Sequence, residues 1–342
     1  MATRMDVAKL AGVSPSTVSR VINDSGYVAA EVRERVLKAI RDLDYIPNRM
    51  ARSLKMKECR QFACVIPSIS NPFYHEIVMG IEETALQNGY TFSLYNMGSE
   101  KREYFKLVLE GFYDGLIFLS PFEVAQVLSL EEISRKIPTA LYCDHRISYV
   151  VPHVYVNLKL AMKRNVEALI QQGHRRIIYL GQEWDLQLEG SRYQGYIESM
   201  ADAGLEVLPD MTQLVPNLLD TLMVGYERTK SLAAVTRDFT AIVASNDLLA
   251  VGAIRALVES GMRVPSDVSV TGIDDVEIAR LMTPTLTTTR IPKREIGNTL
   301  VMMLLDQIRN EHTANSSIEF STEIIFREST SYHPDKREDT GV

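Results

Sequence analysis

The hydrophobic and polar positions of residues 4–23 follow a helical period and predict two short helices joined by a tight turn. Thr3 is of a residue type that caps a helix, and Gly12 is of the type that ends one in the left-handed region. Ser14 can cap the second helix, and Pro15 suits its first position, where the missing N–H would have no partner. The sequence therefore marks the limits of both helices.

The second of these helices has an apolar side and a polar side. Its apolar positions recur at the i, i+3, i+4 spacing and are expected to pack on the first helix. The inward residues are Val18, Val21 and Ile22 of the second helix and Val7, Leu10 and Ala11 of the first. The opposite side carries Ser16, Arg20 and, nearer the edge, Ser19 and Asn23. Small hydroxyl residues let a backbone approach DNA while a guanidinium reaches a guanine, so this side is a candidate base-reading surface. A helical hairpin with a solvated polar side is the alternative.

A third apolar stripe predicts a helix over roughly 30–44, with Val32, Val36, Ala39, Ile40 and Leu43 facing inward. After a break at Pro47, residues 49–56 predict one or two further helical turns, a length that is not stable alone in water. If this segment folds only when docked on DNA, Leu54 can act as an apolar wedge in the minor groove. A plain basic linker is the equally simple alternative.

From Gln61 onward, apolar runs alternate with helical stretches, the pattern of parallel α/β sheets, and two doubly wound lobes are expected. The expected strands lie near 61–67, 90–96, 115–120, 139–143, 176–181, 241–245, 268–273, 286–291 and 323–326. The expected helices begin near Phe73, Glu100 and Glu123 in the first lobe and cover about 159–172, 189–203, 221–235 and 247–260 in the second, with a short turn after Asp275. A helix over 292–310 returns the chain to the first lobe, where it either pairs with a second subunit or is buried within the monomer.

Charge is segregated along the chain. The first sixty residues carry 12 Lys and Arg against 7 Asp and Glu, whereas the whole chain of 342 residues has a net charge of −7. A basic head on an acidic body suits binding to a polyanion with one part only. At this length, and with 46% hydrophobic residues, two or three ordinary soluble domains are expected.

Other functional classes find little support in the sequence. Cys59, Cys64 and Cys143 form no C-x-x-C pair, and neither a signal core nor a membrane span is apparent, so a cytoplasmic protein with reduced thiols and no membrane contact is expected. No Gly-x-Gly-x-x-Gly, Walker, His-Glu-x-x-His or Gly-x-Ser-x-Gly pattern occurs, and the adjacent carboxylates Asp274 and Asp275 should point apart. We therefore expect no catalytic residue, cofactor or metal, and regard an α/β enzyme or a transporter's solute receptor as weaker alternatives.

Nine blocks in fixed order resemble the lactose-repressor (LacI/GalR) family of transcription regulators. They are Asp6-Val-Ala-Lys-Leu-Ala-Gly-Val-Ser, Thr17-Val-Ser-Arg-Val-Ile-Asn, Tyr45-Ile-Pro-Asn, Ala51-Arg-Ser-Leu-Lys, Asn71-Pro-Phe-Tyr, Gly173-His, Ser245-Asn-Asp, Val264-Pro-Ser-Asp-Val-Ser and Leu286-Thr-Thr. The resemblance covers nearly the whole chain. It implies a homodimer that binds a pseudo-palindromic operator in double-stranded DNA, and a core like that of periplasmic binding proteins.

The resemblance also implies a division of the chain. A helix-turn-helix head would cover 1–46, a hinge helix and linker 47–59, and an effector-binding and dimerisation core 60–342. Lobe 1 of the core would comprise about 60–157 and 291–321, and lobe 2 about 158–288 and 323–335.

Family positions carried onto this chain give the candidate DNA-binding residues. Pro15, Ser16 and Arg20 would read bases, Leu54 would enter the minor groove with Lys55 beside it, and Asn48 and Arg49 would anchor the hinge. The full set is Ser14, Pro15, Ser16, Thr17, Arg20, Asn23, Asn48, Arg49, Leu54 and Lys55.

The effector site is expected between the lobes, outside the carboxyl ends of the strands. The candidate ligand-binding residues are Asn71, Phe73, Tyr74, Asp144, His145, Arg146, Trp184, Arg192, Asn246, Asp247 and Asp274. Aromatic faces with Arg, Asn and Asp side chains suit a sugar or sugar derivative, and the fork of Arg192 suits an anionic or hydroxyl-rich ligand. Asp247 and Asp274 can instead serve as caps. Leu186 and Leu188 replace a polar pair of the family's purine-binding members, which disfavours a purine corepressor.

We therefore expect a transcriptional repressor whose affinity for its operator is controlled by a small-molecule effector. A change in lobe angle would alter the spacing of the two hinge segments. Control by a phosphorylated partner protein on the first lobe is the alternative within the same class.

Overall fold

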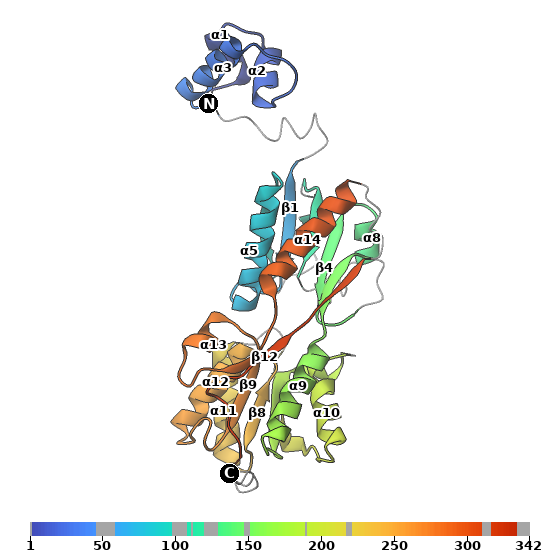
Figure 1. Ribbon diagram of the computed structural model, residues 1–342, viewed down its shortest axis with the longest axis vertical. Coiled ribbons are helices and arrows are strands. Elements are labelled where there is room, and N and C mark those ends of the chain that lie inside the picture. Colours follow the sequence, from blue (N-terminus) through green and yellow to red (C-terminus); the bar gives the residue numbers. More distant parts are fainter. Residues whose placement is uncertain are drawn as a thin grey trace, which may run out of the picture. The chain divides into compact units, whose positions relative to one another are not determined.

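The computed structural model describes residues 2–45, 59–97, 108–110, 112–119, 129–146, 151–188, 190–216, 221–309 and 316–333. The chain divides into two compact units, Met1–Cys59 and Arg60–Val342 (Figure 1). The expected hinge helix, with the candidates Asn48, Arg49, Leu54 and Lys55, lies outside the described residues, as do the helix starts expected near Glu100 and Glu123.

The first unit contains the three expected helices, α1 Arg4–Ala11, α2 Pro15–Ile22 and α3 Ala30–Asp42. The predicted caps are confirmed. The Thr3 side chain accepts from the backbone N–H of Asp6, and the Asp6 carboxylate accepts from the backbone N–H of Thr3. Gly12 ends α1 at φ 64°, and the Ser14 hydroxyl accepts from the backbone N–H of Thr17.

The core of this unit corrects two of the predicted inward positions. Its buried members are Val7, Ala8, Ala11, Val18, Val21, Val36, Ala39 and Tyr45, with Ile22, Ile40 and Leu43 packed against them. Leu10 was expected inside but is 55% exposed, because α1 contacts the other two helices through Val7, Ala8 and Ala11. Val32 is only half-buried and stands outside this cluster.

The second unit contains two sheets, each the centre of one lobe (Figure 1). In lobe 1 the strand order is β11-β5-β4-β3-β1-β2, and all neighbours are parallel. In lobe 2 the order is β12-β10-β9-β8-β6-β7, parallel except for the β10–β12 pair. The strands of lobe 1 are β1 Gln61–Ile66, β2 Thr91–Asn96, β3 Gly115–Phe118, β4 Thr139–Cys143, β5 His153–Val156 and β11 Ser317–Phe320. Those of lobe 2 are β6 Ile177–Gln182, β7 Thr212–Val215, β8 Ala241–Ala244, β9 Ser269–Asp274, β10 Thr287–Arg290 and β12 Glu323–Ile325.

Helices flank both sheets, and those predicted within the described residues are confirmed to within a few positions. Lobe 1 has α5 Pro72–Gln87, α8 Leu130–Ser134 and α14 Lys293–Ile308. Lobe 2 has α9 Leu158–Gln171, α10 Arg192–Asp202, α11 Leu222–Val235, α12 Asp247–Glu259 and α13 Glu277–Leu281, with 3-10 turns η1 Glu183–Leu186 and η2 Pro209–Met211. The strands β5, β7 and β11 were not predicted. The last two lie at the edges of their sheets, and each has two polar and two apolar residues, so neither forms an apolar run.

Helix α14 is buried within the monomer against α5. The two helices approach so closely that a Cβ on Gly80 would lie 2.2 Å from the Arg294 carbonyl oxygen, and a Cβ on Gly297 would lie 2.1 Å from that of Ile77. The apolar side of α14, including Leu300 and Leu304, is accordingly buried. The apolar side of this helix is thus buried within the monomer, as one of the two interpretations expected.

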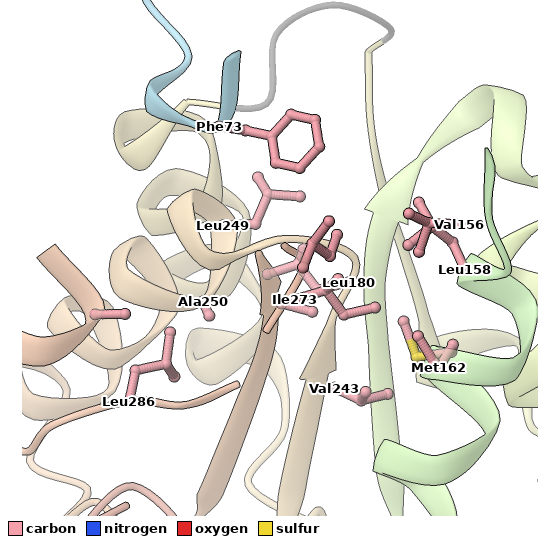
Figure 2. Close-up of a cluster of buried hydrophobic side chains, with 14 of the residues drawn as sticks. Phe73, Val156, Leu158, Met162, Leu180, Val243, Leu249, Ala250, Ile273 and Leu286 are labelled. Carbon is pink, nitrogen blue, oxygen red and sulfur yellow. The ribbon is translucent and has the colours of Figure 1, made fainter. Parts of the chain in front are cut away.

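One hydrophobic cluster extends through both lobes. It joins Phe73, at the start of α5 in lobe 1, with Leu249 of α12 and Ile273 of β9 in lobe 2 (Figure 2). Side chains of the two lobes therefore share one closely packed interior.

Candidate functional site

The outward side of α2 carries the described DNA-binding candidates. Ser14, Pro15, Ser16 and Arg20 are exposed, and Thr17 and Asn23 are half-buried. The Ser14 hydroxyl lies 2.7 Å from that of Ser16 and 2.9 Å from that of Thr17, which fixes the hydroxyl groups at the start of the helix. Among the described residues no carboxylate forms an ion pair with Arg20 at the other end of the helix. This surface can therefore present one guanidinium and a row of small hydroxyl groups to a nucleic acid.

At the start of α5, two candidates serve the fold as well as the site. The Asn71 side chain caps the helix by accepting from the backbone N–H of Phe73 at 3.0 Å. Phe73 is only 6% exposed and belongs to the core that both lobes share. Its ring centroid lies 5.1 Å from that of the half-buried Tyr74 and 5.7 Å from that of Tyr142.

The loop after β4 brings lobe 1 into contact with lobe 2. Asp144 and Arg146 are exposed there, and His145 is half-buried. Asp144 forms an ion pair with Arg192 of lobe 2, with 3.5 Å between Oδ2 and Nη2. A Cβ on Gly190 would lie 3.4 Å from the Cβ of His145, so the segment before α10 passes directly over this loop.

Arg192 is held from its own lobe by Asp185, a residue that sequence reasoning missed. The distance from Arg192 Nη1 to Asp185 Oδ1 is 3.7 Å. Asp185 is fixed in turn, because its Oδ2 accepts from the Tyr179 hydroxyl at 2.6 Å and from the backbone N–H of Gln182 at 3.0 Å. Burial lowers the pKa of the Arg192 guanidinium, but the nearby carboxylates of Asp144, Asp185 and Asp274 outweigh it and raise that pKa. The Arg192 guanidinium therefore stays positively charged among three carboxylates.

The start of α12 contains two buried polar candidates, Asn246 and Asp247. The Asn246 side chain caps this helix by accepting from the backbone N–H of Leu249 at 2.9 Å. Asp247 is fully buried, and its two oxygens accept from the Thr288 hydroxyl and the backbone N–H of Val276, at 2.5 Å and 2.9 Å. Burial raises the pKa of Asp247 to about 7. This geometry favours a structural role for Asp247.

The end of β9 places two adjacent aspartates in an unusual backbone. Asp274 has φ 127° and Asp275 has φ 53°, both in the region that favours glycine. The ammonium of Lys293, a side chain only 2% exposed, donates to both of their carbonyl oxygens, at 2.5 Å and 3.3 Å. Lys293 also forms an ion pair with Glu76 of α5 at 3.3 Å. The backbone that carries Asp274 is thus held from lobe 1.

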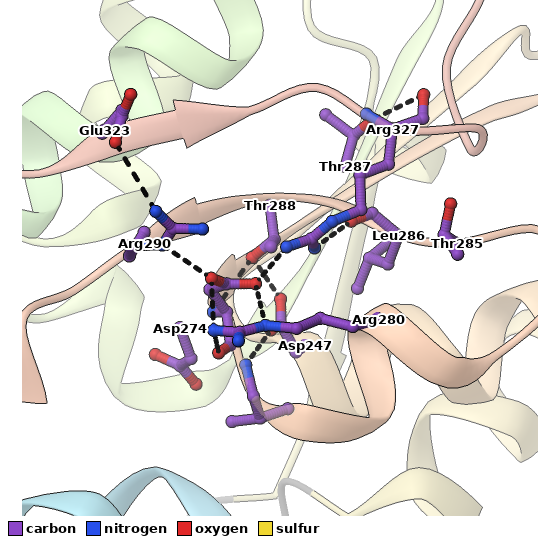
Figure 3. A network of polar contacts seen from close by, with 12 residues as sticks. Asp247, Asp274, Arg280, Thr285, Leu286, Thr287, Thr288, Arg290, Glu323 and Arg327 are labelled. Atoms are coloured by element: carbon purple, nitrogen blue, oxygen red, sulfur yellow. Dashed lines mark hydrogen bonds and ion pairs between the residues drawn. The ribbon is translucent and has the colours of Figure 1, made fainter.

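Asp274 and Asp275 are adjacent in the sequence and were expected to point apart. Their side chains have different surroundings. The fully buried Asp275 side chain binds Arg280 and Arg290 at 2.8 Å and Arg327 at 2.5 Å. Figure 3 labels these three arginines. Burial alone would raise the pKa of Asp275, but hydrogen bonds from these three arginines lower it to about 2. Asp274, in contrast, lies near enough to Arg192 and Tyr142 to shift the pKa of each.

The structure therefore gathers three candidates, Asp144, Arg192 and Asp274, around the buried Tyr142. Trp184 is half-buried in η1, one residue before the Asp185 that holds Arg192. Asp185, within a 3-10 turn, and Tyr142, one residue before the end of a strand, carry no local signal in the sequence that marks them as site residues. Among the described residues no group of His, Cys, Asp and Glu could hold a metal ion. None of the described helices combines the length and the apolar character that a membrane crossing requires.

Comparisons with known proteins match both the helical head and the two-lobed core. Residues 3–48 match the family model for bacterial regulatory proteins of the lacI family, and residues 166–330 match the periplasmic binding protein-like domain. The HTH-type transcriptional regulator RegA of Clostridium saccharobutylicum is 34% identical over 96% of this chain and all of its own length. The HTH-type transcriptional repressor CytR of Escherichia coli is 31% identical over 96% of each chain.

Solved structures with the same fold include complexes with DNA and with a sugar. A Lac repressor dimer bound to operator and the anti-inducer ONPF superposes with a TM-score of 0.83 at 27% identity, over 96% of this chain and 99% of that one. The complex of the transcriptional regulator CelR with cellobiose superposes with a TM-score of 0.70 at 29% identity, over 96% of this chain and 100% of that one.

Proposed function

The chain belongs to the lacI family of bacterial regulatory proteins and is a DNA-binding transcriptional regulator, and from this premise we propose which residues carry its two activities. It binds operator DNA as a homodimer, responds to a small-molecule effector and is not an enzyme. The regulated step is operator binding, so the two activities are base reading by the first unit and effector binding by the second.

Base reading falls to the outward side of α2. Arg20 reaches guanine O6 and N7 in the major groove, Ser16 contacts a neighbouring base edge, and Pro15 offers an apolar contact to a thymine methyl group. Ser14, Thr17 and Asn23 border this surface. The exposure of Arg20, without an ion pair to any described carboxylate, is the observation that supports this assignment.

The hinge residues complete the DNA contact in this proposal. Leu54 enters the minor groove as an apolar wedge with Lys55 beside it, and Asn48 and Arg49 anchor the segment. Support for these four comes from the family resemblance, because they lie outside the described residues.

Effector binding falls to the residues around Arg192, where the lobes meet. The observation that carries this assignment is the ion pair between Asp144 of lobe 1 and Arg192 of lobe 2, since a ligand that binds both side chains contacts both lobes. The gathered carboxylates and guanidinium suit hydroxyl groups, and CelR, a structural relative, binds cellobiose. A sugar or sugar derivative is therefore the proposed effector class, with Asn71, Phe73, Tyr74, His145, Arg146, Trp184, Asn246 and Asp247 as the surrounding candidates.

A binding-site selection tests the proposal as a whole. Full-length protein is incubated with random duplexes at moderate ionic strength, and the retained DNA is sequenced. A pseudo-palindromic consensus is expected, with a preferred guanine in each half-site that is lost in Arg20→Ala. Selection of no consensus would count against the proposal. Control by a phosphorylated partner protein on lobe 1 is supported by no observation among the described residues.

A further inference from the structure

Tyr142 carries a buried hydroxyl without a hydrogen-bond partner among the described residues. Its side chain is 2% exposed on β4, two residues before Asp144. Other buried tyrosines are satisfied: the Tyr179 hydroxyl donates to Asp185 at 2.6 Å, and that of Tyr196 donates to the Ile177 carbonyl at 2.9 Å. An unpaired hydroxyl in a protein interior is destabilising and rare, so the exception requires an explanation.

A second unpaired donor lies close by, on the other lobe. The Nε of Arg192 is buried and donates to no described acceptor, although both Nη atoms have carboxylate partners. Burial raises the pKa of Tyr142, Asp144 and Asp274 raise it further, and Arg192 lowers it, so all four groups interact. At neutral pH the Tyr142 hydroxyl is therefore protonated and can donate. Two donors without described acceptors, one on β4 of lobe 1 and one on α10 of lobe 2, are therefore close enough to interact electrostatically.

We propose that the Tyr142 hydroxyl and Arg192 Nε both bind the effector directly, and that this effector is an uncharged, polyhydroxylated molecule. The inference rests on the proposed function and extends its effector site by a residue that the sequence did not indicate. A hydroxyl group of the ligand accepts from Tyr142 or Arg192 and donates to Asp144 or Asp274, so polyols satisfy both kinds of group.

Charge excludes an anionic ligand. Arg192 already faces three carboxylates, from Asp144, Asp185 and Asp274, so it has no spare positive charge for a phosphate or carboxylate. Four cations around the end of β9 are also engaged: Lys293 is paired with Glu76, and Arg280, Arg290 and Arg327 surround Asp275. Arg146, on the loop after β4, is exposed to solvent, where water screens its charge. An incoming anion would be desolvated among more negative than positive charge, which is strongly unfavourable.

Tyr142→Phe in the full-length chain tests the role of the hydroxyl without any ligand. Removing a satisfied buried hydroxyl destabilises a protein, whereas removing an unsatisfied one does not. We expect Tyr142→Phe to melt at or above the wild-type midpoint, and the matched control Tyr196→Phe, which loses its bond to Ile177, to melt below it. A fall in Tyr142→Phe as large as that in Tyr196→Phe would overturn the proposal.

Matched ligand pairs test the chemical class. A panel of neutral sugars and nucleosides, including D-ribose, D-glucose, cellobiose and cytidine, is compared by thermal shift with ribose 5-phosphate, glucose 6-phosphate and cytidine monophosphate. We expect stabilisation by an uncharged member but not by its phosphorylated counterpart, with affinity about 10-fold lower in Tyr142→Phe. A largest shift from a phosphorylated member, no shift from any neutral member, or equal affinity in Tyr142→Phe would each overturn the proposal. If the operator selection yields no consensus, the proposed function is wrong. The melting comparison of Tyr142→Phe with Tyr196→Phe does not depend on that result.

Discussion

Asp144 and Arg192 belong to different lobes, and their side chains form an ion pair at 3.5 Å. Asp144 follows β4 of lobe 1, and Arg192 begins α10 of lobe 2. On its own side the guanidinium is held by Asp185, which is itself fixed by the Tyr179 hydroxyl. A ligand that engages Arg192 therefore changes how the lobes are joined, and this is the proposed origin of the regulatory response.

Replacing Arg192 separates effector response from DNA binding. Arg192→Met removes the donor that faces Asp144, Asp185 and Asp274, so we expect operator affinity to become insensitive to sugars while ligand-free operator binding remains. The measurement is operator titration at fixed salt with and without the stabilising sugar. Lys163→Met is the control, because Lys163 also forms an ion pair in lobe 2, at 2.7 Å from the exposed Asp202, and neither residue is an effector-site candidate. An unchanged sugar response in Arg192→Met would contradict the site.

Arg20 is predicted to set base preference. We expect Arg20→Ala to weaken specific operator binding by about 1–3 kcal/mol and to relax the preference at one position in each half-site. Lys38→Ala, on an exposed position of α3, should change affinity little and leave the selected sequence unaltered. Binding-site selection with both variants makes the comparison, and a preferred sequence that survives Arg20→Ala would refute the assignment.

Leu54 is predicted to act at the DNA and nowhere else. Leu54→Ala should reduce operator affinity, because a smaller side chain stabilises a kinked base step less well. The dimer and its sugar binding should be unaffected, as judged by sedimentation and by thermal shift. Operator affinity equal to that of the wild type at the same salt concentration would show that no wedge is formed.

Asp275 is predicted to stabilise lobe 2. Asp275→Asn leaves three arginines around a neutral group, and we expect a loss of about 3 kcal/mol in the free energy of unfolding. The pKa of Asp275 is lowered from 3.8 to about 2, so its contribution is complete above about pH 5 and is lost progressively as the pH falls from there through about 2.

Urea unfolding of both proteins across pH checks this prediction. The difference in unfolding free energy between wild type and Asp275→Asn should be constant near neutrality and shrink below about pH 5. Asp267→Asn provides the control, since the pKa of Asp267 is also lowered to about 2 but its partner Arg263 is on the surface. A difference that does not depend on pH, or an equal loss in the control, would contradict the role of Asp275.

Local signals in the sequence predicted the head almost completely. Thr3, Gly12, Ser14 and Pro15 act within one helical turn of their partners, so their roles can be inferred from neighbours alone. Leu10 was misplaced because residue spacing predicts which side of a helix is apolar, whereas the contacts with α3 decide which positions are covered.

The candidate effector site was only partly accessible to such reasoning. Asp144 and Arg192 were found because they follow a strand and begin a helix, and the ends of parallel strands meet. Tyr142 and Asp185 were missed, since an unpaired hydroxyl or a supporting carboxylate is defined by residues distant in sequence. Asp247 was included on position alone, and its complete burial depends on Thr288, 41 residues away.

The most direct test of the whole account is the operator affinity of the full-length chain, measured at fixed salt with and without each neutral sugar of the panel. The account predicts tight, sequence-specific binding that at least one uncharged sugar changes at least about 5-fold, a response that Arg192→Met abolishes. No preference for any duplex over random competitor, with every sugar present or absent, would contradict it.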